Sequence, residues 1–394
     1  MNILLAIACT SANPQAGDDY SVNSIGAELF DVHGAGAQRS DPKSGDPADY
    51  AGGHGPQGDV VRIYNYARCV RGSSPSLPDT SQQDCWASEG GEVDCAGTGQ
   101  DGAYEGEVEL SLDGEVVVDA VSGLSWVAAT DFASFDEAEA VASELAVGGF
   151  EDWRVPTVSE LYTLIDFSGA TGTAAPESSE APEDAVPYVD DGLFDFEYPT
   201  DARYIDAQYL TSSVYVSEVE LGGDQGGQEA FFGVNFADGR IKGYPTSGSG
   251  PNSDYHVWFV RGSMGQGGYT DQGDGTVLDE ATGLVWMQED SGAGMDWDEA
   301  LAWCEGMELA GQDDWRLPDA HELQSLVDYS RSPDTTDSPA IDQAFVSTAI
   351  IDEEGDPDWP FYWSSTTHKD GIEQWTWAVY VAFGEAKGYG ATGM

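Results

Sequence analysis

The sequence predicts an α+β fold that contains two copies of one repeat. Residues 113–262 (repeat one) and 274–394 (repeat two) carry the same ordered signals, namely a β-hairpin, an amphipathic helix, a second helix start and a late strand. Hairpins together with two helices in each copy give the α+β class. A chain of 394 residues is long enough for two or three domains that each bury a core.

Each repeat begins with a hairpin. Residues 116–126 match residues 276–286, and both runs close on the pattern Gly-Leu-x-Trp. Alternating β-forming residues flank a turn in which Gly123 or Gly283 can take the positive φ that a tight turn needs. The sequence therefore predicts a two-stranded hairpin at both positions.

An amphipathic helix follows the hairpin in each repeat. It starts at Phe135 in repeat one and at Trp297 in repeat two, and both starts read aromatic-Asp-Glu-Ala. Alanines and larger apolar residues recur behind each start at the spacing of a helix face. A helix that packs one face against the hairpins is the expectation.

An Asp-Trp-Arg-x-Pro motif comes next and marks a second helix start. Its Trp lies 18 positions after the aromatic residue of the first helix in both repeats. Thr157 and Asp319 each stand three residues before a glutamate, which is typical of a capping box. The arginines could act as anion hooks, but we favour a structural role, with the Trp in the core and the Arg paired with a carboxylate. The motif residues are Trp153, Arg154 and Glu160 in repeat one and Trp315, Arg316 and Glu322 in repeat two.

A late strand and a closing hairpin complete the pattern. Residues 209–213 parallel residues 362–366, and the hairpin of residues 234–244 has a less exact counterpart at 379–389. The Gly-, Ala-, Pro- and Glu-rich stretch 168–187 reads as a long loop inside repeat one.

These motifs resemble the bacterial Lcl C-terminal domain family, which is named for a collagen-like adhesin. Members of that family show the patterns T-G-L-x-W, A-x-x-C, D-W-R-L-P-x-x-x-E-L, W-S-S-T and R-C-V-R. Both repeats match most of these patterns, and together the repeats cover about two thirds of the chain. The resemblance implies a compact α+β domain of the C-type-lectin-like kind. It also implies binding of carbohydrate or matrix at a cell surface, with no established catalysis.

Repeat two lacks a terminal strand. Repeat one ends with the strand-like residues 256–262, whereas repeat two stops without one, and a matching stretch stands alone at 64–72. Segment 20–72 therefore resembles the missing C-terminal part of repeat two. A circular permutation, a remnant of an earlier third repeat and an error in the assembled gene would each explain this arrangement, and we favour the first.

The cysteines also indicate that segment 20–72 belongs with repeat two. The counterpart of Cys304 in repeat one is Ala142, and the counterpart of Cys69 is Phe259, so both partners are missing together. This joint absence predicts a Cys69–Cys304 disulfide, with two free thiols as the alternative. A local bridge between Cys85 and Cys95 would staple a polar loop that has little core. No spacing typical of a zinc site occurs.

The N-terminus and the net charge indicate an exported protein. The apolar run from Met1 to Cys9 resembles a lipobox, in which Cys9 would be cleaved and lipidated, although a buried N-terminal strand is the alternative. We expect a secreted or outer-membrane surface lipoprotein that meets the membrane only through this lipid anchor. A balance of 72 acidic against 14 basic residues gives a net charge of −58, which excludes nucleic acids as partners.

The expected domain order follows from these features. It is a leader and tether (1–19), the segment that resembles the end of a repeat (20–72), a Cys-containing connecting segment (73–112), repeat one (113–262) and the domain of repeat two (269–394).

Two residue sets in repeat two are candidate sites. Aromatic side chains that could stack on sugar rings are Trp359, Tyr362, Trp363, Trp375 and Trp377, although alternating aromatics in hairpins are more often core. Carboxylates that could hold calcium are Asp352, Glu353, Glu354 and Asp356, although solvated surface charge is the more common reason for such a cluster.

The sequence contains no catalytic motif of a known class. We therefore expect a non-enzymatic adhesin that binds a glycan or a matrix component, with calcium as the one cofactor considered. The alternatives are an extracellular hydrolase that acts on polysaccharide and a structural envelope protein without a small ligand.

Overall fold

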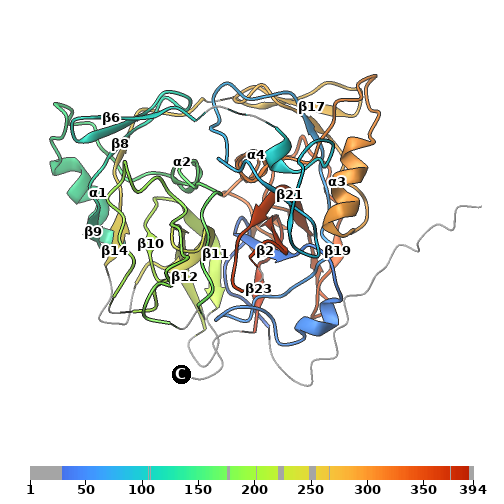
Figure 1. Ribbon diagram of the computed structural model, residues 1–394, viewed down its shortest axis with the longest axis horizontal. Coiled ribbons are helices and arrows are strands. Elements are labelled where there is room, and N and C mark those ends of the chain that lie inside the picture. Colours follow the sequence, from blue (N-terminus) through green and yellow to red (C-terminus); the bar gives the residue numbers. More distant parts are fainter. Residues whose placement is uncertain are drawn as a thin grey trace, which may run out of the picture.

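One nine-stranded sheet runs through both repeats of the computed structural model (Figure 1). The structure describes residues 29–104, 106, 108–174, 178–200, 202–220, 226–247, 254–265, 267–372 and 374–389, so Cys9 and the leader lie outside the described residues. The strand order is β21 (Phe361–His368), β22 (Trp377–Ala382), β2 (Gln38–Pro42), β13 (Arg240–Pro245), β12 (Gly227–Asn235), β10 (Gln208–Tyr209), β14 (Tyr255–Val257) and β9 (Asp131–Ala133), with β11 (Val214–Glu220) paired to β12.

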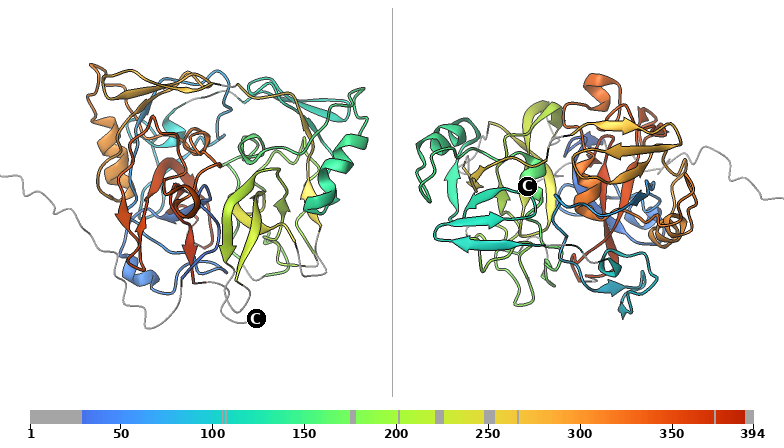
Figure 2. Two further views of the ribbon diagram at one scale, coloured as in Figure 1. Left: turned by 180° about the vertical axis from the view of Figure 1, so that it is seen from behind. Right: turned by 90° about the horizontal axis from the view of Figure 1, so that it is seen from above.

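Each repeat has one four-stranded sheet, and both of these sheets lie at the top in Figure 1, above α2 and α4, and at the top of the left view in Figure 2. In repeat one the order is β15 (Val260–Arg261), β8 (Ser125–Val127), β7 (Val116–Asp119) and β6 (Leu110–Asp113). In repeat two it is β16 (Tyr269–Asp271), β17 (Thr276–Asp279), β18 (Val285–Met287) and β3 (Val70–Arg71). Three strand pairs stand apart, namely β1 (Phe30–Asp31) with β23 (Lys387–Gly388), β19 (Ile350–Ile351) with β20 (Pro357–Asp358), and β4 (Cys85–Trp86) with β5 (Glu92–Val93).

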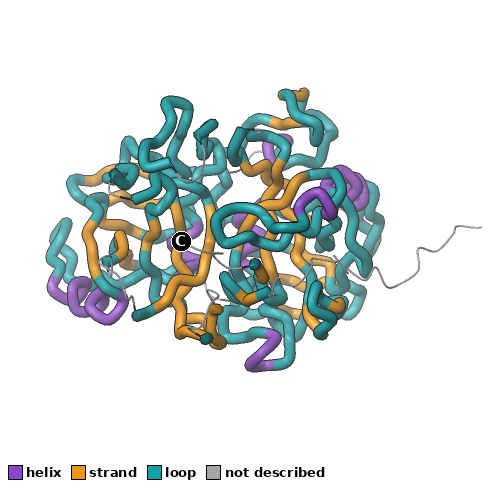
Figure 3. The backbone as a smooth tube through the Cα atoms, turned by 90° about the horizontal axis from the view of Figure 1, so that it is seen from below, coloured by secondary structure: helices purple, strands orange, loops and turns teal. Residues whose placement is uncertain are grey.

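The helices are short and lie at equivalent places in the two lobes (Figure 1). They are α1 (Phe135–Glu144), α2 (Val158–Tyr162), α3 (Trp297–Glu305), α4 (Ala320–Ser325) and α5 (Pro333–Thr336), with two 3-10 turns at Pro47–Tyr50 and Asp101–Ala103. Both predicted capping boxes form, because the side chains of Thr157 and Asp319 accept from the glutamate amide while each glutamate accepts from the cap amide. Viewed from below, loops surround these elements (Figure 3).

The predicted α+β, C-type-lectin-like fold is wrong. Strands hold about 30 % of the residues and helices about 12 %, so the fold is β-rich with two Lcl-type repeats. The helix signals are genuine, but they belong to helices of only 4 to 10 residues. The sequence predicts the two helices of each repeat correctly but not the share of the chain that helices occupy, because a capping motif marks where a helix starts and not how far it runs.

Residues 29–72 are built into repeat two. Val70 pairs with Trp286 just as Val260 pairs with Trp126, so β3 borders the hairpin of repeat two as β15 borders that of repeat one. Tyr66 lies beside Tyr362 in the parallel sense in which His256 lies beside Tyr209. The N-terminal segment thus occupies in repeat two the position that residues 255–262 occupy in repeat one.

The closing hairpin predicted for residues 379–389 does not form. In repeat one β12 and β13 make that hairpin, with six residue pairs from Asn235↔Arg240 to Ala230↔Pro245. In repeat two β2 takes the place beside β22, from Gln38↔Val381 to Pro42↔Trp377, and β23 pairs with β1 instead. A strand from the N-terminus therefore joins the sheets of the two repeats.

Both expected disulfides are present. Cys69 and Cys304 are bonded with a Cα–Cα distance of 5.5 Å, and Cys85 is bonded to Cys95. Cys69 and Cys304 are fully buried in the same hydrophobic cluster as Trp297 and Trp363. In repeat one Ala142 and Phe259 pack together in the equivalent cluster. Within the described residues, no helix has the length and apolar character that a membrane span requires.

Candidate functional site

The aromatic residues predicted to bind a ligand do not share one surface. Tyr362, Trp363 and Trp377 are buried, Trp359 is half-buried, and only Trp375, at 37 % exposure, reaches the surface. The Tyr362 hydroxyl donates to Asp290 at 2.6 Å, and the Trp363 indole donates to a backbone carbonyl at 3.0 Å. As strands β21 and β22 are covered on both faces, the buried rings pack in the core, and the five predicted residues are not brought together on one stacking surface.

The acidic cluster predicted to hold calcium is neutralised by the chain's own cations. Asp352 accepts from the amides of Glu354 and Asp356 at 2.9 and 2.8 Å, and the Lys387 ammonium contacts both Asp352 and Glu354. Glu353 is paired with Arg62 at 2.8 and 3.1 Å. No group of three or more acidic, His or Cys side chains is arranged to hold a metal ion in the described part of the chain. This cluster therefore does not form the predicted calcium site.

The motif arginines have structural contacts in both repeats. Arg154 meets Glu160 with two hydrogen bonds of 2.7 and 2.6 Å, and Arg316 meets Glu322 with two of 2.6 Å. Each guanidinium also donates to the backbone carbonyl just after the terminal strand, of Gly262 at 2.8 Å or Gly72 at 3.1 Å. The arginine thus fastens the terminal strand to the helix start.

The motif tryptophans lie in the core. Trp153 and Trp315 are both buried, and each indole N–H donates to a nearby backbone carbonyl, of Phe150 at 3.2 Å and Leu309 at 3.3 Å. These contacts agree with a role in packing rather than in binding.

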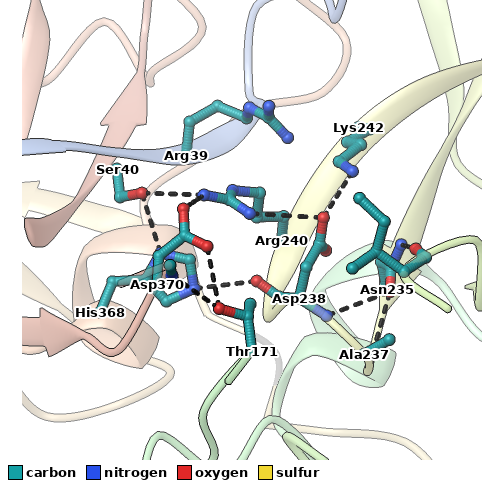
Figure 4. A network of polar contacts seen from close by, with 12 residues as sticks. Arg39, Ser40, Thr171, Asn235, Ala237, Asp238, Arg240, Lys242, His368 and Asp370 are labelled. Atoms are coloured by element: carbon teal, nitrogen blue, oxygen red, sulfur yellow. Dashed lines mark hydrogen bonds and ion pairs between the residues drawn. The ribbon is translucent and has the colours of Figure 1, made fainter. Parts of the chain in front are cut away.

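A buried polar network connects the two repeats (Figure 4). The Lys242 ammonium donates to Asp238 at 2.7 Å, and Arg240 contacts Asp370 of repeat two. The His368 ring is held between the Ser40 hydroxyl and the Asp238 carbonyl, each at 2.8 Å. Since the carbonyl can only accept, Nε2 of His368 carries the proton and Nδ1 accepts from Ser40.

This network joins the two repeats structurally and is not a reactive site. Burial, followed by the charge of Arg240, lowers the pKa of His368 to about 3, which keeps the imidazole neutral. Only one residue pair, Ile241 with Gln38, joins β13 to β2. The polar network therefore supplies much of what holds the sheet together at this point. Sequence analysis missed it because its members come from three segments far apart in the chain.

The Lys and Arg side chains are buried or half-buried within the fold. All 14 Lys and Arg residues lie in the part that the structure describes, and none of them is exposed. The acidic residues are left to dominate the surface, so the exterior repels polyanions more strongly than the composition alone indicates.

An open cleft of about 520 Å³ lies in repeat one. It is bounded by the end of β8, the segment after α1 and the loop of residues 192–195. Phe194 and Phe259 line it from the core side, and the exposed carboxylates of Glu115, Asp131 and Asp195 stand around it. An apolar cleft with a few polar groups at its rim is the usual form of a small-ligand site.

Small side chains keep this cleft open. Ala128 and Ala129 line it, and their counterparts in repeat two are Gln288 and Glu289. The Gln288 amide reaches across to the carbonyl of Ala344 at 3.1 Å, which closes the equivalent position. The motifs shared by the repeats cannot reveal such a cleft; the difference between Ala128-Ala129 and Gln288-Glu289 is the signal that the sequence offers.

Comparison with known proteins agrees with the internal repeat. The family described as the Lcl C-terminal domain matches residues 115–261 and 275–393. No curated protein and no solved structure is measurably similar to the chain.

Proposed function

This chain belongs to the Lcl C-terminal domain family, and we propose that it is a non-enzymatic adhesin whose repeat-one cleft binds neutral or amino-bearing glycans. Membership of the family indicates a bacterial, surface-associated protein. Secretion or attachment through a lipidated Cys9 is part of the proposal.

The cleft of repeat one is the observation on which this proposal rests. A sugar ring has an apolar face, which suits a lining that includes Leu193 and Phe194, and hydroxyl or ammonium groups, which suit carboxylate acceptors. Glu115, Asp131 and Asp195 supply three such acceptors at the rim. A net charge of −58 opposes sulfated and uronic glycans, which narrows the ligand class to neutral and cationic sugars.

The experiment is a glycan array that holds neutral, amino-bearing and sulfated glycans as three sets and is probed with the full chain. We expect saturable binding in the first two sets only. The double substitution Ala128→Gln with Ala129→Glu introduces the residues of repeat two and should abolish this binding. Ala140→Glu, at an exposed position on α1, is the control for added charge and should leave it unchanged.

The same experiment separates the alternatives. Binding that survives the double substitution, or that occurs only on sulfated sugars, would contradict the proposed cleft. Release of reducing ends from a bound polysaccharide, lost when one of the three rim carboxylates is replaced, would favour the hydrolase instead. Absence of binding up to millimolar protein would favour a structural envelope protein.

A further inference from the structure

Two equivalent faces of the repeats differ in their cover, because the described part of the chain covers one of them and leaves the other open. The Arg154 face consists of Arg154, Thr157, Ser212 and Ser213 in repeat one. The Arg316 face consists of their counterparts Arg316, Asp319, Ser365 and Thr366 in repeat two.

The framework of the two faces is the same. The first amide of α2 donates to the Ser213 hydroxyl at 3.0 Å, and the first amide of α4 donates to the Thr366 hydroxyl at 2.9 Å. The amides of Ser212 and Ser365 donate to the carbonyl of the motif proline at 2.8 and 2.7 Å. A ligand group that contacts the Thr366 hydroxyl on one face therefore finds an equivalent hydroxyl, that of Ser213, on the other, although Thr157 stands where the second face has Asp319.

The chain's own connecting segment covers the Arg316 face, and in Figure 1 this segment, drawn in blue to cyan, crosses in front of α4 and β21. The Thr366 hydroxyl donates to the buried carboxyl of Asp101 at 2.6 Å. The Tyr104 ring lies over the Arg316 guanidinium, 5.1 Å from its carbon. A carboxyl group and an aromatic ring three positions apart thus complete this face.

None of the residues that the structure describes covers the Arg154 face in this way. Exposure of the arginine side chain is 34 % for Arg154 against 12 % for Arg316. Ser365 and Thr366 are fully buried, whereas Ser212 is exposed and Ser213 is half-buried. The Ser213 hydroxyl accepts from α2, and it donates no hydrogen bond to any of the described residues.

We propose that the Arg154 face is a docking site for a segment of a partner protein in which a 3-10 turn presents Asp-x-x-Tyr or a similar carboxyl and ring pair, as residues 101–104 do. The carboxylate would accept from Ser213, and the ring would stack on Arg154, as Asp101 and Tyr104 do in repeat two. Because the chain has a net charge of −58, an acidic segment approaches against repulsion. Binding should therefore tighten as salt is added, which is the reverse of the usual salt dependence.

The test uses the full chain and a synthetic peptide of residues 77–104, closed by its Cys85–Cys95 disulfide, as the probe. We expect one peptide to bind per chain, with higher affinity at 1 M than at 0.1 M NaCl. Peptides with Asp101→Asn or Tyr104→Ala should bind at least tenfold more weakly, and these changes leave the protein itself intact.

Protein variants locate the site. Ser213→Ala should weaken binding of the unchanged peptide at least tenfold, whereas Ser213→Thr, which introduces the residue of repeat two, should preserve it. Ser143→Ala, at an exposed position on α1, is the control. No saturable binding up to 1 mM peptide would overturn the proposal. So would binding that is insensitive to both peptide changes and to Ser213→Ala, or formation of chain dimers in place of peptide binding.

Discussion

The guanidinium of Arg71 donates two hydrogen bonds, of 2.7 and 3.0 Å, to the carboxylate of Asp314, although 243 positions separate the two residues. Arg261 makes the same two-point contact with Asp152 in repeat one, at 2.8 and 3.2 Å. The terminal strand and the motif loop are thus joined identically in both repeats. In repeat two, however, the strand comes from the start of the chain, so residues 29–72 are part of that repeat's fold.

The long-range disulfide should contribute more to stability than the local one. Cys69–Cys304 closes a loop of 235 positions, for which chain entropy gives about 5.5 kcal/mol, against roughly 2–3 kcal/mol for the 10 positions of Cys85–Cys95. Urea unfolding of the two double Cys→Ser variants measures both losses. Equal losses, or a smaller loss for the long loop, would contradict this expectation.

A repeat-one replacement provides the matched control for that experiment. Cys69→Phe with Cys304→Ala introduces the pair that packs in repeat one, Phe259 with Ala142. Because the ring refills the space left by the sulfurs, this variant should unfold at a higher urea concentration than the double serine variant.

The two motif arginines should differ in their contribution to stability although each makes the same contacts with its glutamate and with a glycine carbonyl. Arg316→Ala leaves Glu322 buried without its partner, which costs about 3–5 kcal/mol for a buried ion pair. Arg154→Ala should cost less, because solvent reaches a third of that side chain and screens the charge of Glu160. Chemical denaturation of both variants checks this order, and a larger loss for Arg154→Ala would argue against it.

Burial raises the pKa of Asp101 from 3.8 to about 7. Between these values the folded chain holds a proton that the unfolded chain has released, so the stabilisation is complete below pH 3.8 and is lost as the pH rises through 7. The Asp101→Asn variant lacks this titration. The unfolding free energy of the natural chain should therefore fall relative to the variant by about 3 kcal/mol between pH 5 and 9. Parallel pH profiles for the two chains would refute this role of Asp101.

Salt should stabilise the chain without a specific calcium effect. The acidic surface repels itself, since none of the 14 cationic side chains is exposed, and added ions screen that repulsion. The melting temperature should rise by several degrees between 0.05 and 1 M NaCl, and equally with CaCl2 of the same ionic strength. A larger rise with calcium at low millimolar concentration would indicate a site that the carboxylates around Lys387 do not provide.

Features that repeat along the chain could be predicted from the sequence. The hairpins, the capping boxes and the pairing of Arg154 with Glu160 follow from short motifs whose geometry is local. The Cys69–Cys304 bond is not local, but comparison of the repeats reveals it because both partners are absent together from repeat one.

Features that depend on solvent access could not be predicted in this way. Alternation of aromatics in β21 and β22 does not indicate that both faces of these strands are covered, so Tyr362 and Trp363 were assigned to a surface that does not exist. The cleft of repeat one exists because the small side chains of Ala128 and Ala129 leave space unfilled. The Arg154 face is open because the connecting segment lies over the other repeat. A sequence motif indicates which residues contact each other, whereas a cleft forms where such contacts are missing.

Disulfide mapping tests the central claim, that residues 29–72 complete repeat two, most directly. The intact chain is digested without reduction and its linked peptides are identified by mass spectrometry. The account predicts one peptide containing Cys69 joined to one containing Cys304, and Cys85 joined to Cys95. Recovery of Cys69 or Cys304 as a free thiol, or of Cys69 joined to Cys85 or Cys95, would contradict it.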